Sequence, residues 1–100
     1  MQITVTSPEA GGKHLAVEGD VDVHTADEFR RVIAESETST PLTINLSQVS
    51  FMDSTGLGVL IGALTRSREA GSRLVLEAPS PRVDRLLSLT GIVEQFEITE

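Results

Sequence analysis

A carboxylate and two hydroxyls stand side by side at Asp53, Ser54 and Thr55, at the start of a pattern typical of a helix. The first turn of a helix has backbone N–H groups without intrahelical partners, and a single N-cap side chain can satisfy them. This end of a helix also favours added negative charge and can donate hydrogen bonds to phosphate oxygens. An exposed hydroxyl here is therefore a candidate phosphoryl acceptor, and plain helix capping is the alternative.

Three glycines, Gly56, Gly58 and Gly62, fall inside the same helix. Each interior glycine costs roughly 1 kcal/mol of helix stability relative to alanine, and close approach of another surface would explain the cost. For Gly56 and Gly58 that surface is either the protein's own core or a partner, and the sequence leaves both open.

The large apolar residues of this helix predict its buried side: Leu57, Leu60, Ile61 and Leu64. At 100° per residue the opposite stripe faces outward and contains Thr55, Val59, Gly62 and Arg66. We therefore predict an external contact at Gly62. A phosphoryl group beside this stripe adds about 1.5 to 2 negative charges, which would disturb a docked partner and leave the domain folded.

Hydrophobic patterns place this helix within alternating strands and helices. Strands are predicted at 2–6, 13–18, 41–46, 73–77 and 95–99, and helices at 25–36, 54–70 and 81–90. Thr25 with Glu28 forms a capping-box pattern, and Gly71 stands where a left-handed C-terminal cap belongs.

This order predicts an α/β fold in one domain over residues 1–100. Strands that alternate with helices favour right-handed crossovers and a parallel sheet. The first strand is expected to join antiparallel, through a hairpin. The expected architecture is a mixed, mostly parallel sheet of four to five strands with about three helices.

Composition narrows the function classes. Fifteen acidic and eight basic residues give a formal charge of −7, which argues against nucleic acid as a partner. The chain has no cysteine and no long apolar run, so we expect a cytoplasmic protein without membrane insertion, disulfides or a thiolate metal site. We also expect no cofactor and no bound metal.

Four segments together resemble one known family: GDVDVHTA at 19–26, INLSQVSF at 44–51, FMDSTGLG at 51–58 and LTGIVEQF at 89–96. The sequence is similar to bacterial anti-sigma factor antagonists of the STAS domain family, over essentially the whole chain. Many similar proteins have a further C-terminal helix, whereas this sequence stops at Glu100 after its last predicted strand.

The resemblance implies a regulatory protein that switches partners and is not an enzyme. The unphosphorylated form would bind an anti-sigma factor that is also a serine kinase, and thereby free a sigma factor. Phosphorylation at Ser54, with ATP held by the kinase, would end the binding, and a phosphatase would restore it. Thr55 would be structural or, less often, an alternative acceptor.

The resemblance also implies a docking surface around the acceptor: Asp53, Thr55, Gly56, Gly58, Val59 and Gly62. Asp22 and Asn45 match family positions that lie near the acceptor. Turn capping for Asp22 and loop hydrogen bonding for Asn45 are the alternatives to kinase contact.

Other classes fit less well. An aspartic protease would have Asp, then Thr or Ser, then Gly, whereas D-S-T-G has one residue more. A serine hydrolase would need a G-x-S-x-G motif together with a partner histidine; His14 and His24 are present, but the motif is not. A receiver domain would need a lysine after a late strand, but the only lysine is Lys13. The main alternative function has the same fold: the chain would be a STAS subunit of a lipid-transport or stress-signalling complex and would use the same helix face for a different partner.

Overall fold

Five strands form one sheet in the computed structural model, which describes residues 1–100. The strands are β1 (Gln2–Thr6), β2 (Lys13–Val21), β3 (Leu42–Met52), β4 (Leu74–Glu77) and β5 (Glu97–Thr99). They lie side by side in chain order. β1 pairs with β2 antiparallel and every other pair is parallel, so the predicted mixed sheet with an antiparallel first strand is confirmed.

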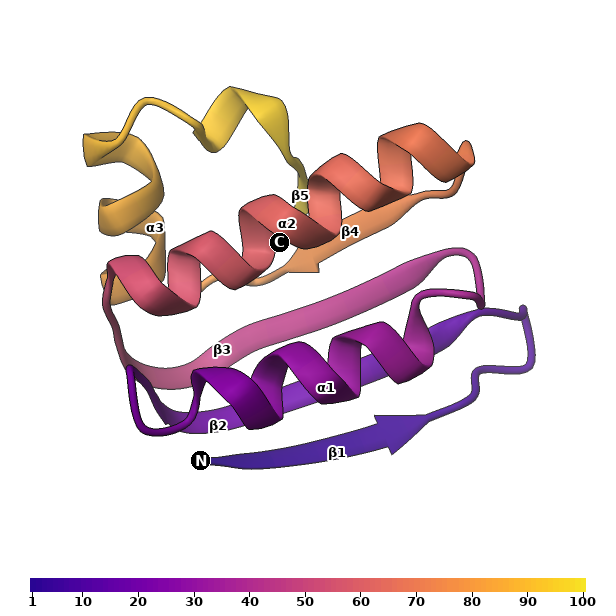
Figure 1. Cartoon of the computed structure of the whole chain (residues 1–100), viewed down its shortest axis with the longest axis horizontal. Helices are drawn as coiled ribbons and strands as arrows, with labels where there is room; N and C mark the ends of the chain where they lie inside the picture. The colour runs from indigo at the N-terminus through magenta and orange to yellow at the C-terminus, as the bar shows by residue number, and fades with distance from the viewer.

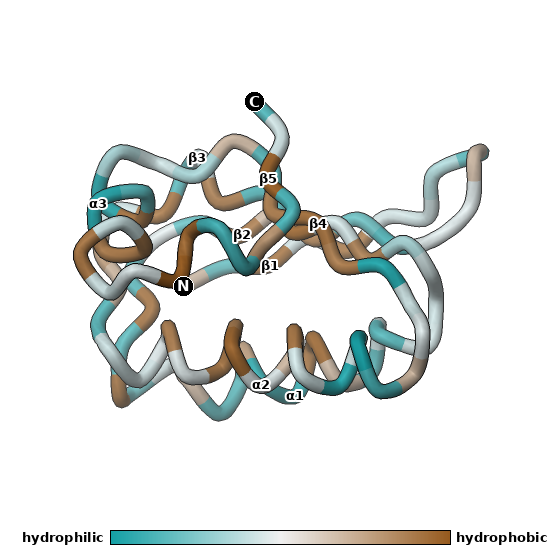
Figure 2. The backbone as a smooth tube through the Cα atoms, turned by 90° about the horizontal axis from the view of Figure 1, so that it is seen from above, coloured by the Kyte–Doolittle hydropathy of each residue, from teal (hydrophilic) through white to brown (hydrophobic).

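Each parallel pair of strands is joined through a helix. The helices are α1 (Ala26–Ser36), α2 (Ser54–Ala70) and α3 (Pro81–Leu89), and a 3-10 turn, η1 (Val93–Gln95), precedes β5. α1 and α2 lie side by side across β2, β3 and β4 (Figure 1). Their hydrophobic turns face the strands, whereas α3 lies apart from them, beside one end of the sheet (Figure 2).

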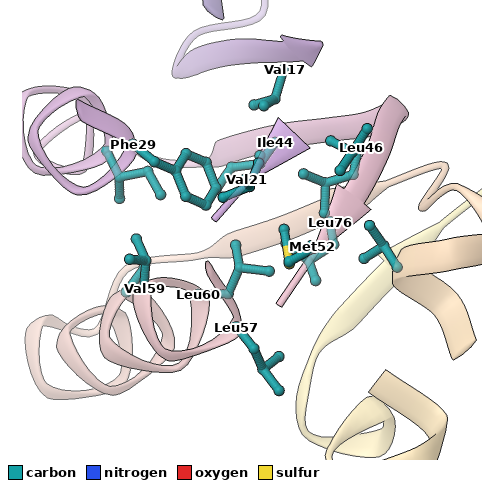
Figure 3. Close-up of a cluster of buried hydrophobic side chains, with 14 of the residues drawn as sticks. Val17, Val21, Phe29, Ile44, Leu46, Met52, Leu57, Val59, Leu60 and Leu76 are labelled. Carbon is teal, nitrogen blue, oxygen red and sulfur yellow. The ribbon is translucent and has the colours of Figure 1, made fainter. Parts of the chain in front are cut away.

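The main core lies between the sheet and the α1–α2 layer. Alternate residues of β2 and β3 enter it, and Phe29 of α1 and Leu60 of α2 meet them from the other side (Figure 3). Phe29, Leu60 and Ile44 are fully buried. The apolar residues that recur every second position in the strands and about every 3.6 positions in the helices thus pack together in one core layer.

β2 and β3 both run further than their alternating patterns predict. β2 continues to Val21 and β3 to Met52, beyond the expected ends at residues 18 and 46. Their pairing shifts register twice, between Ala16 and Glu18 and between Gly19 and Asp20. A bulge interrupts the alternation of inward and outward residues, which explains why the pattern ended too early.

The helix-end signal predicted at Gly71 is confirmed, and the one predicted for α1 is not. Gly71 ends α2 in the left-handed conformation, and the Ser80 hydroxyl accepts a hydrogen bond from the N–H of Val83 at the start of α3. The capping box predicted at Thr25 is wrong, because Thr25 has helical φ and ψ and makes no cap hydrogen bond. Its hydroxyl instead donates to the Asp20 carbonyl and accepts from the Asp22 N–H, both at 3.0 Å.

Candidate functional site

The predicted site lies at the sheet edge where β2 and β3 end and α1 and α2 begin (Figure 1). The two connections are joined directly, because the Asp53 N–H donates to the Val21 carbonyl over 3.3 Å. The carboxyl ends of neighbouring parallel strands meet at this edge, where ligands of α/β proteins commonly bind.

Asp53 is the N-cap of α2. One carboxylate oxygen, Oδ1, accepts hydrogen bonds from the N–H groups of Thr55 at 2.9 Å and Gly56 at 3.2 Å. A carboxylate at this position also interacts favourably with the positive end of the helix dipole. Capping therefore accounts for the aspartate of the D-S-T run and leaves both hydroxyls unexplained.

Ser54 is the first residue of α2 and is exposed, and its hydroxyl makes no hydrogen bond within the chain. The structure corrects one part of the sequence argument. Because Asp53 already occupies the Thr55 and Gly56 N–H groups, these donors are not available to a phosphate on Ser54. A phosphoryl group on Ser54 would therefore not find these two donors free, and it would have the Asp53 carboxylate as its neighbour in sequence.

The outward face of α2 differs from the one predicted. Val59, expected outside, is only 3% exposed and lies on the side of α2 toward Phe29 of α1 (Figure 3), whereas Ile61, expected inside, is 40% exposed. α2 contacts both the sheet and α1, so its buried sector is rotated toward its smaller residues. Four of the exposed positions of α2 lie on one helix face and form what we call the α2 stripe: Ser54, Gly58, Ile61 and Thr65.

The glycines of α2 have different surroundings. A Cβ on Gly56 would lie 2.8 Å from Val21 Cγ1 and 2.9 Å from Met52 Cγ, so this glycine permits close packing of α2 on the strand ends. Gly56, like Val59, therefore belongs to the core and not to the docking surface. A Cβ on Gly58 would meet nothing within 4 Å, so the domain's own packing does not require this glycine.

Gly62 is half-buried, and a Cβ there would approach only the Arg66 guanidinium, at 3.2 Å. Thr55 is half-buried, and its hydroxyl makes no hydrogen bond. The predicted external contact at Gly62 and the predicted structural role of Thr55 remain predictions.

Asp22 lies in the β2–α1 connection at the same edge. Its Oδ1 accepts from the His24 N–H at 2.9 Å, and its carbonyl accepts from the N–H groups of Thr25 and Ala26. Asp22 therefore shapes the turn, as its alternative explanation proposed. The turn presents Val23, which is 66% exposed and follows Val21, the residue whose carbonyl accepts from the Asp53 N–H, by two positions.

Asn45 does not join this group. It pairs with Ala16 of β2, five residues before the Val21–Met52 pair, which places it about 17 Å along the sheet from the site. Its amide donates to Glu77 Oε1 at 2.8 Å, and its carbonyl oxygen accepts from the Ser47 N–H and hydroxyl. The expectation that Asn45 lies near the acceptor is wrong, and its hydrogen bonds are structural.

Glu77 links this polar group across the sheet face that α1 and α2 leave open. His14 Nε2 lies 2.8 Å from the same Oε1 that accepts from Asn45. Hydrogen bonds from Asn45 and, second, from His14 hold the pKa of the Glu77 carboxyl below its usual range.

Sequence reasoning missed the exposed apolar residues of the site, Val23 and Ile61. Val23 stands in a loop and belongs to no periodic pattern, while Ile61 was counted as core because of its size. No cluster of three His, Cys, Asp or Glu side chains is arranged to hold a metal ion. None of the helices combines the length and the apolar character needed to cross a bilayer.

Comparison with known proteins places the whole chain in one group. The family described as the STAS domain matches residues 4–100. An anti-sigma-B factor antagonist of Listeria monocytogenes is 36% identical over 102 residues, which cover 98% of this chain and 90% of that protein.

Solved structures agree on the fold. An anti-sigma factor antagonist from Mycobacterium paratuberculosis has a TM-score of 0.85 and 27% identity, over 98% of this chain and 84% of that one. The Bacillus cell fate determinant SpoIIAA, solved in its phosphorylated form, has a TM-score of 0.76 and 20% identity, over 99% of this chain and 92% of that one.

Proposed function

Because this chain belongs to the STAS domain family, we propose that it is an anti-sigma factor antagonist whose binding is controlled by phosphorylation of Ser54. In its unphosphorylated form the protein binds an anti-sigma factor with serine kinase activity, and a sigma factor is released. The phosphorylated form does not bind, and a phosphatase returns it to the active pool.

One observation carries the assignment of the acceptor: Ser54 is exposed at the end of the α2 stripe, and its hydroxyl is bound to nothing in its own chain. A kinase can reach such a hydroxyl without unfolding the helix. Thr55 is half-buried and less accessible. The phosphorylated form of the structural neighbour SpoIIAA supports a switch of this kind within the fold.

The transfer step needs little from this chain beyond the hydroxyl. The Ser54 oxygen forms a bond to the γ-phosphorus of ATP held by the kinase, the bond from that phosphorus to the β,γ-bridging oxygen breaks, and ADP leaves. The hydroxyl proton passes to a base on the kinase. Asp53, the nearest carboxylate in sequence, is engaged by the Thr55 and Gly56 N–H groups, and we assign it to positioning the helix end.

The effect of the phosphate on binding is electrostatic. A surface that docks on the α2 stripe must cover Ser54, because Gly58 and Ile61 follow it on the same helix face. A phosphoryl group adds about 1.5 to 2 negative charges where Asp53 already contributes one. Its desolvation and its charge then oppose a partner that fits the neutral hydroxyl.

The test uses Ser54→Ala and Ser54→Asp, with Thr38→Asp as the matched charge control. Thr38 is also exposed and its side chain makes no hydrogen bond, but it follows the C-terminal end of α1, whereas the site lies where α1 begins. The three variants and the wild type serve as baits in a pull-down from host lysate, and each bait's intact mass is measured after incubation with the eluate and ATP.

We expect the wild type, Ser54→Ala and Thr38→Asp to retain an ATPase-type kinase, and Ser54→Asp to lose it with an unchanged unfolding midpoint. Only the wild type and Thr38→Asp should gain one phosphate. A phosphate on Ser54→Ala would refute the acceptor. Recovery of membrane-complex subunits in place of a kinase would favour the rival STAS function.

A further inference from the structure

Two arginines on α3, Arg82 and Arg85, have no acidic partner in an otherwise acidic protein. The chain carries eight lysines and arginines against fifteen acidic residues. Four arginines form ion pairs with carboxylates: Arg30, Arg31, Arg66 and Arg73. Arg68 donates to Gln95, and Lys13 donates to Ser7. Arg82 and Arg85 are exposed and make no hydrogen bond or ion pair.

These arginines share one face of α3 with apolar side chains. Arg82, Arg85, Leu86 and Leu89 follow the i, i+3, i+4, i+7 spacing of a single helix face. Val83 and Leu87 point the other way and are fully buried, so this face is directed outward. We call these four residues the α3 patch.

The α3 patch has features of an unoccupied contact surface. Leu89 is 76% exposed, the highest value among the large apolar side chains that are exposed. All four residues, together with Met52, line an open hollow of about 310 Å³. The Arg82 guanidinium lies 5.2 Å from the centre of the Phe51 ring, a cation–π distance that orients the group and leaves its charge unpaired.

The patch lies at the same edge of the molecule as Ser54. Met52, which lines the hollow, is the last residue of β3, and Ser54 begins α2 two residues later. α3 packs on β3 beside this end of the sheet and lies apart from α2 (Figure 2). A protein large enough to cover the α2 stripe can therefore reach the α3 patch as well.

We propose that the α3 patch is a second docking surface for the anti-sigma factor kinase, and that it receives a segment of that kinase with carboxylates and an apolar side chain. This inference rests on the proposed function. Charge complementarity selects the occupant, because carboxylates would pair with Arg82 and Arg85 while an apolar side chain covers Leu89. Nucleic acid and an anionic membrane are disfavoured by the net charge of −7.

The two kinds of side chain act on different steps. Opposite charges accelerate the encounter of two proteins, so the arginines should raise the association rate constant, most strongly at low salt. Apolar contact acts after docking, so Leu89 should lower the dissociation rate constant.

The test measures association and dissociation rates of the purified kinase with ADP, so that no phosphoryl transfer occurs. The main variant is Arg82→Glu/Arg85→Glu. The matched control is Arg30→Glu/Arg31→Glu, which changes net charge equally on an exposed part of α1. Arg82→Gln/Arg85→Gln replaces the main variant if charge reversal impairs folding, and Leu89→Ser tests the apolar contact.

We expect the α3 double variant to associate about tenfold more slowly at low salt, with the difference shrinking as salt rises, and the α1 control to change no more than about twofold. Leu89→Ser should dissociate several-fold faster. Equal rates for the α1 and α3 variants would overturn the patch while leaving the proposed function intact.

Failure of the wild type to bind would refute the proposed function and this inference with it. A final experiment measures binding of the wild type and the α3 double variant to vesicles of phosphatidylglycerol and phosphatidylcholine. Binding of these vesicles by the wild type and not by the α3 variant would overturn the protein-docking proposal, because it would assign the arginines to a membrane surface.

Discussion

Gly56 and Gly58 stand two residues apart in α2, and they have opposite surroundings. Gly56 lies against Val21 and Met52, closer than any side chain would allow, whereas Gly58 has open space where a Cβ would be. The first glycine is explained by the fold. The second lowers helix stability without a packing reason, which points to a requirement outside the chain. Glycine thus occurs both on the buried side and on the proposed docking side of the same helix.

The largest effect should come from Gly56→Ala. The added methyl group must displace Val21 and Met52, and overpacking of this kind typically costs about 1 to 3 kcal/mol of unfolding free energy. Urea unfolding followed by circular dichroism measures the change. An unaltered midpoint would mean that the strand ends move aside freely, and the contrast between the two glycines would disappear.

Gly58→Ala should have the opposite effect on stability. With no atom near the new methyl group, the domain should gain about 0.4 to 1 kcal/mol in the same unfolding experiment. Binding of the kinase should become roughly tenfold weaker, because a methyl group in a closely packed interface costs about 1 to 3 kcal/mol. Stabilisation with unchanged affinity would remove Gly58 from the docking surface.

The smallest effect should come from Glu77→Gln, which changes β4 and not α2. Because the pKa of Glu77 is lowered in the folded state, its hydrogen bonds stabilise the protein above the usual glutamate pKa, and this contribution is lost as the pH falls through the lowered value. Glu77→Gln should therefore be less stable than the wild type at pH 7, by no more than about 1 kcal/mol.

The difference between Glu77→Gln and the wild type should vanish in strongly acidic solution, as measured by urea unfolding at both pH values. Kinase binding at pH 7 should not change, because Glu77 lies near Asn45 and away from the docking edge. A loss of affinity in this variant would extend the interface to the open sheet face.

Local chemistry made much of this fold predictable. The Asp53 cap, the Gly71 terminator and the alternating residues of the strands each act within a few neighbours, so a single sequence reveals them. An exposed hydroxyl beside the cap was also predictable in this way, because Ser54 follows Asp53 at the helix start. The choice of Ser54 as the proposed acceptor came from the family resemblance.

What failed depends on contacts distant in sequence. The orientation of α2 is set jointly by the sheet and by α1. The sequence prediction placed Ile61 in the core because it is the larger side chain and Val59 outside, but Val59 is the buried one. Asn45 was misplaced because the bulged extension of β3 carries the strand far past it before α2 begins. Neither fact follows from periodicity alone.

The Ser54 hydroxyl has no bond to lose within its own chain. Its chemical state can therefore alter what an approaching molecule meets while the folding equilibrium stays the same. The phosphorylation that we propose at Ser54 would then change the binding surface and leave the melting temperature nearly the same. The ratio of modified to unmodified protein would be set by the kinase and the phosphatase, and not by a difference in folding.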